Sequence, residues 1–193
     1  MRMGVLASIA ATIAVIALPG CSASSTTDQT SAAPSAGPIP PVNNPRDVAA
    51  MARRPCELLT AQQARGFRLD VPPEQSDGLF GTLDCKWTTT TPDRRIVRRV
   101  YVSMFTNNPT LAVAYNKGRS LPYFQLTEIA GYPAIVTRTN ADLPSCDIDI
   151  KVAQRQSVSV AYDSEEFTNN PQQSCVVAKQ VAASVVMNLP PKS

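Results

Sequence analysis

Two pairs of cysteines constrain the fold of this chain more than any other feature. Cys56 is followed by Cys85, and Cys146 is followed by Cys175. Four cysteines allow three disulfide connectivities, and the sequence alone does not choose between them. We favour Cys56–Cys85 and Cys146–Cys175, because each pair joins the start of a predicted helix to a nearby predicted strand. Each disulfide would close a loop of about 30 residues, for which the chain-entropy model gives about 3.5 kcal/mol.

The fifth cysteine, Cys21, ends a pattern at the N-terminus. Arg2 precedes an apolar run over residues 5–18, and Gly20 stands directly before Cys21. This pattern predicts a bacterial lipoprotein signal peptide that is removed before a lipidated Cys21. The alternative, a transmembrane anchor, needs roughly 18 to 20 apolar residues, and the run is shorter than that. We therefore expect acyl chains such as palmitate to hold the protein on the extracytoplasmic face of the cell membrane, where disulfides persist.

The absence of histidine excludes several classes of activity. The chain has no histidine, which removes histidine-activated nucleophiles, histidine-ligated zinc and the usual general base near neutral pH. No two cysteines have the spacing of a redox or zinc motif. The formal net charge of +3 indicates no dense basic face for nucleic acid. We expect no metal, no cofactor, no nucleic-acid partner and no enzymatic activity.

Composition divides the chain into three parts. Residues 1–20 form the predicted signal peptide, and residues 21–54 form the lipidated cysteine with a Ser/Thr/Pro-rich tether. Between residues 22 and 44 the only charged residue is Asp28, so this segment has too little apolar surface to order itself. Glycosylation of the tether is an open alternative. Residues 55–193 form a single envelope domain.

Hydrophobic periodicity within the domain predicts an α+β fold. Helices are expected over residues 61–66, where Thr60 is the N-cap, and over 110–118 and 173–187. Alternating apolar residues predict strands over 83–88, 95–105, 126–129, 133–138, 147–152 and 157–162. The last two strands share an apolar face only if residues 153–155 form a three-residue loop. The order of elements predicts a mainly antiparallel sheet covered by helices.

One candidate binding site is a group of arginines at the start of a predicted strand. Its members are Arg94, Arg95, Arg98 and Arg99, and together they could bind anionic lipid headgroups or wall polymers. The simpler interpretation is a solvated edge strand that its charges protect against aggregation. Asp163, Glu165 and Glu166 are read as an acidic loop.

A second candidate is an apolar pocket for a lipid or a peptide. It would be lined by the aromatic residues Tyr115, Tyr123, Phe124 and Tyr132. Ordinary core packing is the alternative, and it is also the interpretation that we favour for Trp87.

Two further groups of residues could bind a metal ion or take part in catalysis. Asp147 and Asp149 project from the same face of one strand, about 7 Å apart, a spacing suited to calcium or to acid–base work. We expect a solvated strand face instead. Lys151 lies across from Ser157, but an exposed lysine stays protonated and does not act as a base.

The order of several short motifs resembles a known family. The motifs are Pro55-Cys56-Glu57-Leu58-Leu59-Thr60, Cys85-Lys86-Trp87, Ala130-Gly131-Tyr132-Pro133-Ala134, Cys146-Asp147-Ile148, Cys175 with Ala178 and Val181, and Leu189-Pro190. Behind the signal at Cys21, they resemble small actinobacterial cell-envelope lipoproteins of unknown function, of the LprB/LprC type. The resemblance implies an envelope lipoprotein, and it supplies no catalytic motif.

These observations favour a non-enzymatic binding or interaction module whose partner is an envelope protein, an anionic lipid or a wall polymer. The alternatives are a histidine-independent enzyme that acts on the cell wall and a carrier of a lipid or another ligand. Two carboxylates with raised pKa values in a deep cleft would favour the enzyme, whereas an apolar concave surface would favour binding.

Overall fold

A computed structural model describes residues 39–69, 72–78, 81–107 and 110–193. The predicted signal peptide, Cys21 and most of the predicted tether therefore lie outside the described residues. Among the described residues, no helix is long and apolar enough to cross a membrane.

Seven antiparallel strands form one sheet in the order β1-β2-β3-β7-β6-β5-β4. The strands are β1 (Glu74–Asp77), β2 (Leu83–Thr90), β3 (Ile96–Phe105), β4 (Tyr123–Ile129), β5 (Tyr132–Arg138), β6 (Ser145–Lys151) and β7 (Ser157–Ser164). The helices are α1 (Ala61–Gly66), α2 (Thr110–Gly118) and α3 (Gln172–Asn188), with short 3-10 turns η1 (Pro55–Leu58) and η3 (Glu165–Phe167). This confirms the α+β prediction.

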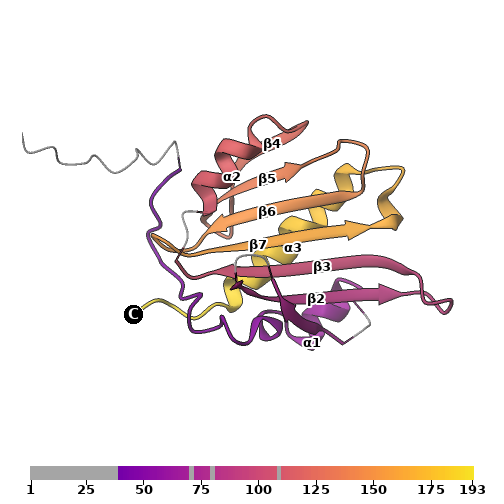
Figure 1. Ribbon diagram of the computed structural model, residues 1–193, viewed down its shortest axis with the longest axis horizontal. Coiled ribbons are helices and arrows are strands. Elements are labelled where there is room, and N and C mark those ends of the chain that lie inside the picture. The colour runs from indigo at the N-terminus through magenta and orange to yellow at the C-terminus, as the bar shows by residue number, and fades with distance from the viewer. Residues whose placement is uncertain (1–38, 70–71, 79–80, 108–109) are drawn as a thin grey trace, which may run out of the picture. The chain divides into compact units, whose positions relative to one another are not determined.

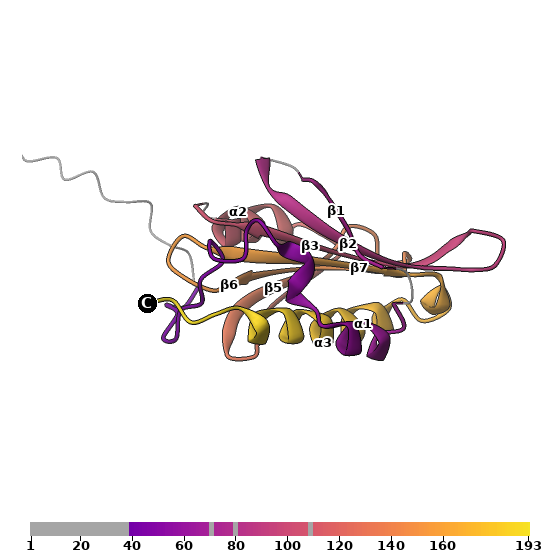
Figure 2. The same ribbon diagram turned by 90° about the horizontal axis from the view of Figure 1, so that it is seen from below.

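The helices cover both faces of the sheet, as Figures 1 and 2 show. Helices α1 and α3 lie on one face, and α2 lies on the opposite face near β5 and β6. The α3 side holds the main core, because alternate residues of the central strands point to it. Its fully buried members include Ile148, Ile150, Val158 and Val160.

Helix α3 is stabilised by its docking on this core. Valine loses side-chain freedom in a helix and is a modest helix former. Val181 and Val185 nevertheless sit in α3 with no exposed surface, together with Ala178 and Ala182. The apolar stripe that the sequence predicted is therefore the face that packs on β6 and β7.

Both predicted disulfides are present. Cys56 in η1 is bonded to Cys85 in β2, with Cα atoms 5.0 Å apart. Cys146 in β6 is bonded to Cys175 in the first turn of α3, with Cα atoms 5.1 Å apart. Each disulfide joins a helical segment to the sheet, as expected.

Two hairpins join β6 to β7 and β4 to β5, and the first has the predicted three-residue loop. Ile150 pairs with Val158, and the Val152 N–H donates to the Gln156 carbonyl at 3.0 Å, which closes the three-residue loop. In the β4–β5 hairpin, Ala130 (φ 51°) and Gly131 (φ 82°) both occupy the left-handed region, as a tight turn with matching twist requires.

One strand was missed. No strand was predicted over residues 74–77, but they form β1, which pairs with β2 at the sheet edge. All four residues of β1 are exposed, so no apolar alternation marks this strand. Its side chains instead provide charge, and Glu74 forms an ion pair of 2.6 Å with Lys86, which suits an unprotected edge.

The segment before the predicted domain start at residue 55 packs against the rest of the fold. Val48 is fully buried in the core, and its N–H donates to Gln156 Oε1 at 2.9 Å. Arg46 forms a β-bridge with Pro191, and its N–H donates to the Val152 carbonyl at 2.9 Å. The segment 40–54 is therefore part of the fold, which a Pro- and Asn-rich composition did not indicate.

Candidate functional site

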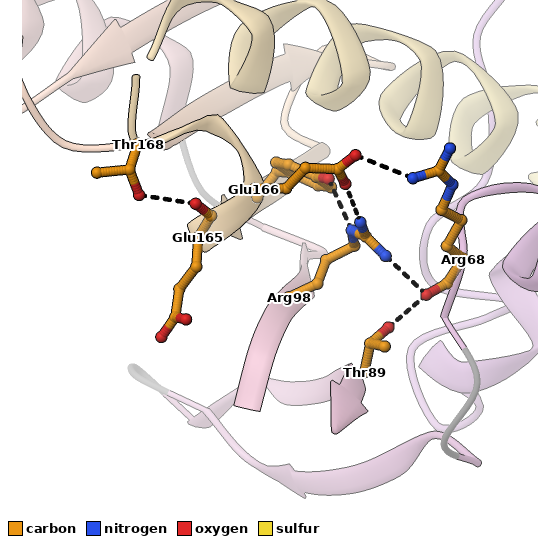
Figure 3. A network of polar contacts seen from close by, with 7 residues as sticks. Arg68, Thr89, Arg98, Glu165, Glu166 and Thr168 are labelled. Atoms are coloured by element: carbon orange, nitrogen blue, oxygen red, sulfur yellow. Dashed lines mark hydrogen bonds and ion pairs between the residues drawn. The ribbon is translucent and has the colours of Figure 1, made fainter. Parts of the chain in front are cut away.

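The predicted arginine cluster is largely neutralised by the predicted acidic loop. Figure 3 shows Arg98 beside Glu166, which also accepts from Arg68 Nη1 at 2.9 Å. Only 7% of the Arg98 side chain is exposed. Its Nε donates to the Tyr162 hydroxyl at 3.1 Å, and its Nη1 donates to the Arg68 carbonyl at 2.9 Å. Arg98 therefore holds three segments of the domain together.

The other three arginines of this cluster have different partners and surroundings. Arg95 pairs with Glu165, and Arg99 lies 3.5 Å from Asp163. Arg94 is exposed in a turn, with φ at 66°. Because Arg98 and Arg99 alternate along β3, they project from opposite faces of the sheet. The structure does not bring the four guanidinium groups to one surface.

The edge-strand interpretation of these arginines is also wrong. β3 lies between β2 and β7. Arg98 is 6% exposed on the same face of β3 as the buried Val100, whereas Ile96 is 42% exposed. The pairing of Arg98 with Glu166 and Tyr162 compensates for its burial.

The four aromatic residues do not line one pocket. Tyr115 and Phe124 form an edge-to-face pair with centroids 5.7 Å apart, between α2 and β4. Tyr123 lies beneath the buried Arg138, whose Cζ is 6.0 Å from the ring centroid. Tyr132 is at the opposite end of β5, where its hydroxyl donates to the Asn44 carbonyl at 2.7 Å. Their roles are packing and hydrogen bonding.

The surface around Asp147 and Asp149 is less solvated than expected. Both residues are only partly exposed. They lie on the α2 side of β6, where Asp149 is flanked by Ile135 and Ser159. The pKa of Asp149 is raised to about 6, mainly by burial, while a hydrogen bond from Ser159 opposes the shift and the nearby Asp147 adds a smaller increase. Burial also raises the pKa of Asp147.

The remaining candidates are the Lys151–Ser157 pair and a possible metal site. Lys151 is paired with Ser157 across β6 and β7 as expected, and its Nζ donates to the Pro40 carbonyl at 3.3 Å. Within the described residues, no cluster of three or more histidine, cysteine, aspartate or glutamate residues has the geometry of a metal site.

The sequence did not reveal a cavity of about 690 Å³ between α1 and β2. Its floor consists of the buried side chains of Leu59, Ala64, Leu69 and Trp87. Its walls include Cys56, Ala61, Pro72 and Pro73, and its polar members are Glu57, Thr60 and Arg65. The size lies within the range of small-molecule sites, and an apolar lining with few polar groups is typical of them.

Local sequence explains why α1 borders an open space. Thr60 and Gln63 form a capping box, in which the Gln63 N–H donates to Thr60 Oγ1 at 3.1 Å and the Thr60 N–H donates to Gln63 Oε1 at 2.8 Å. Besides Arg65, the residues of α1 that line the cavity are Ala61 and Ala64, whose small side chains leave it unfilled.

Charge at the rim of this cavity is uneven. Glu57 is paired with Arg54 at 2.8 Å. Arg65 is exposed, and among the ion pairs of the described residues it has no partner. An apolar floor beside a free guanidinium group suits a ligand with an apolar body and an anionic head.

Comparisons with known proteins give a family and no function. No curated protein and no solved structure matches the sequence. The sequence model of DUF3558, described as a protein family of unknown function, matches residues 16–188. This match extends from the predicted signal peptide to the end of α3, and the chain therefore belongs to the DUF3558 family.

Proposed function

We propose that the protein is a lipid-anchored lipoprotein of the cell envelope whose domain binds an anionic amphiphile without catalysing a reaction. The motif at Cys21 and the resemblance to actinobacterial envelope lipoproteins of the LprB/LprC type support the location. The two disulfides also support it, because such bonds persist in an oxidising compartment.

The cavity beside α1 is the observation that carries the binding function. Its floor offers apolar side chains to a hydrocarbon body, and Arg65 offers a cation to a carboxylate or phosphate head. The Cys56–Cys85 disulfide fixes η1 to β2, and both elements contribute to the cavity. A site that is formed before binding loses less entropy when a ligand enters.

The single tryptophan of the chain allows a direct test, because Trp87 lies on the cavity floor. A brominated fatty acid that enters the cavity should quench Trp87 fluorescence in a saturable manner. Ala61→Phe places a bulky ring at the cavity wall and should weaken quenching at least tenfold. Ala141→Phe, at an exposed alanine elsewhere, should bind like the parent.

A second variant, compared on an acidic and a neutral ligand, tests the role of Arg65. Arg65→Gln should weaken binding of the brominated acid several-fold and leave binding of a brominated neutral alcohol of equal length unchanged. Equal quenching in the parent and Ala61→Phe proteins, or none in either, would contradict binding in this cavity.

A second candidate is a histidine-independent enzyme that acts on the cell wall. The specific observation in its favour is Asp149, whose pKa of about 6 suits proton transfer near neutral pH. Asp149→Asn should abolish any hydrolysis of purified wall polymer by the parent protein. Parent protein that leaves the polymer intact would contradict this candidate.

A further inference from the structure

Five basic residues surround the point where the chain enters the fold. We name them the anchor-end cluster: Arg46, Arg53, Lys151, Arg155 and Lys192. Figure 1 shows the entering segment, the β6–β7 turn and the C-terminal segment at the same end of the sheet. This end is opposite the β2–β3 turn that carries Arg94.

Hydrogen bonds connect the segments that carry these cations. The Arg46 N–H donates to the Val152 carbonyl, and the Lys192 N–H donates to the Pro45 carbonyl, both at 2.9 Å. Lys151 Nζ reaches the Pro40 carbonyl at 3.3 Å. The cluster therefore surrounds the entering segment on several sides.

Arg53 and Arg155 extend the cluster across the end of β3. Arg155 Nε donates to Asn107 Oδ1 at 2.6 Å. Asn107 and Arg53 both line a surface cavity of about 490 Å³, together with Thr82 and Phe105. This hollow at the edge of the cluster is large enough for a polar headgroup.

The cluster differs in its partners from four of the arginines outside it. Arg68, Arg95, Arg98 and Arg99 all pair with carboxylates. Among the described ion pairs, none includes a member of the anchor-end cluster. Their described side-chain hydrogen bonds go to uncharged oxygens.

Four carboxylates lie near this end, and two of them accept hydrogen bonds from other groups. Asp47 accepts from the Ala49 N–H at 2.9 Å, and Asp84 accepts from Thr82 Oγ1 at 3.0 Å. Asp77 and Glu128 are exposed near the β1–β2 and β4–β5 turns. None of the four forms an ion pair with the cluster in the described structure.

We propose that the anchor-end cluster lies against the headgroups of anionic phospholipids in the membrane that holds the acyl chains of Cys21. This inference rests on the lipid anchor of the proposed function. The predicted tether has 17 residues between Cys21 and Ile39, and a random-coil chain of that length has a root-mean-square span of about 21 to 25 Å. Such a tether gives an effective concentration on the order of millimolar, so weak attraction is sufficient.

Lysine footprinting of the mature acylated protein tests this orientation. The protein is reconstituted in vesicles of phosphatidylglycerol or phosphatidylcholine, labelled briefly with an amine-reactive ester and analysed by peptide mass spectrometry. Lys151 and Lys192 should react about fivefold more slowly on the anionic vesicles. Lys117, exposed on α2, should react equally on both. Salt at 1 M should remove the difference, because it screens exposed charges.

A matched pair of variants separates the cluster from overall charge. Arg53→Gln with Arg155→Gln should reduce the protection of Lys151 and Lys192. Arg94→Gln with Arg119→Gln removes the same charge from exposed positions outside the cluster and should preserve the protection. Equal effects of the two double variants would overturn the inference, as would equal labelling on both vesicles.

The anchor and the orientation fail in distinguishable ways. A chain that incorporates no labelled fatty acid and does not float with the vesicles overturns the anchor and this inference together. An acylated protein that floats with the vesicles, but whose lysines react equally on both, overturns the orientation alone.

Discussion

Arg98 Nε donates to the Tyr162 hydroxyl at 3.1 Å across two neighbouring strands. Both residues face the core, where Tyr162 is 2% exposed and Arg98 is 6% exposed. A guanidinium group at such a position is tolerated only when its donors find partners. The partners here are Tyr162, the Arg68 carbonyl and Glu166, which come from three different segments.

Replacing Arg98 should therefore destabilise the domain more than replacing a neighbouring exposed arginine. Arg98→Ala should lower the free energy of unfolding by about 2 to 4 kcal/mol, because it removes a buried ion-pair partner and leaves polar groups unsatisfied. Arg95→Ala should cost less than about 1 kcal/mol, because its pair with Glu165 is exposed. Urea denaturation followed by circular dichroism measures both values, and equal costs would contradict a structural role of Arg98.

Lipidation and folding should use separate residues. Cys21→Ser should abolish incorporation of a labelled fatty acid and leave the melting temperature of the domain nearly unchanged, because Cys21 precedes the described fold. Metabolic labelling followed by electrophoresis measures the incorporation. Equal labelling of the parent and the variant would refute the assignment of Cys21.

Loss of either disulfide should cost a large part of the stability. The double variants Cys56→Ser/Cys85→Ser and Cys146→Ser/Cys175→Ser should each lose about 2 to 5 kcal/mol, out of a typical 5 to 15 kcal/mol. Non-reducing peptide mapping of the parent protein should show Cys56 linked to Cys85 and Cys146 linked to Cys175. Free thiols or crossed links would contradict this pairing.

The sequence predicted the elements in which apolar residues recur at a regular period. Strands β6 and β7 and helix α3 follow apolar periodicity, and the hairpin register follows from the need to keep Ile150 and Val158 on one face. Strand β1 was missed because backbone pairing with β2 forms it without apolar side chains. The burial of Val48 was not predicted, because Val48, Met51 and Ala52 give only a short and weak helical pattern.

The candidate sites were harder to predict than the fold, because each depends on contacts between distant segments. Arg98 and Glu166 are far apart in sequence, and only the β3–β7 pairing brings them together. The α1 cavity depends on residues from η1, α1 and β2. The local pattern of apolar and polar residues carries no information about a cavity that forms between separate segments.

A close approach between α2 and the sheet leads to a prediction for Gly118. A Cβ atom at this position would lie 2.8 Å from Thr137 Cγ2 and 3.2 Å from a ring carbon of Phe124. Gly118→Ala should therefore destabilise the domain by about 1 to 3 kcal/mol through overpacking. Adding Thr137→Ser, which removes the opposing methyl group, should recover part of this loss in thermal denaturation. A fully stable Gly118→Ala protein would show that α2 shifts freely on the sheet.

The buried position of Asp149 predicts a dependence of stability on pH. Its pKa is about 6 in the folded protein and about 3.9 in an unfolded chain. Between these values the folded state binds more protons, so the stability of the domain should fall as pH rises from about 4 to about 6. The loss from this group should approach about 3 kcal/mol, and Asp147, whose pKa is also raised, should add to it in the same direction.

Two asparagine variants isolate this contribution. Asp149→Asn cannot ionise, so its free energy of unfolding should change less between pH 4.5 and pH 7 than that of the parent, and it should be the more stable of the two at pH 7. Asp142→Asn, at an exposed position, should retain the pH dependence of the parent. Urea unfolding at several pH values measures all three proteins. If the Asp149→Asn and parent curves have the same slope between pH 4.5 and pH 7, Asp149 is solvated in the native state and the raised pKa is refuted.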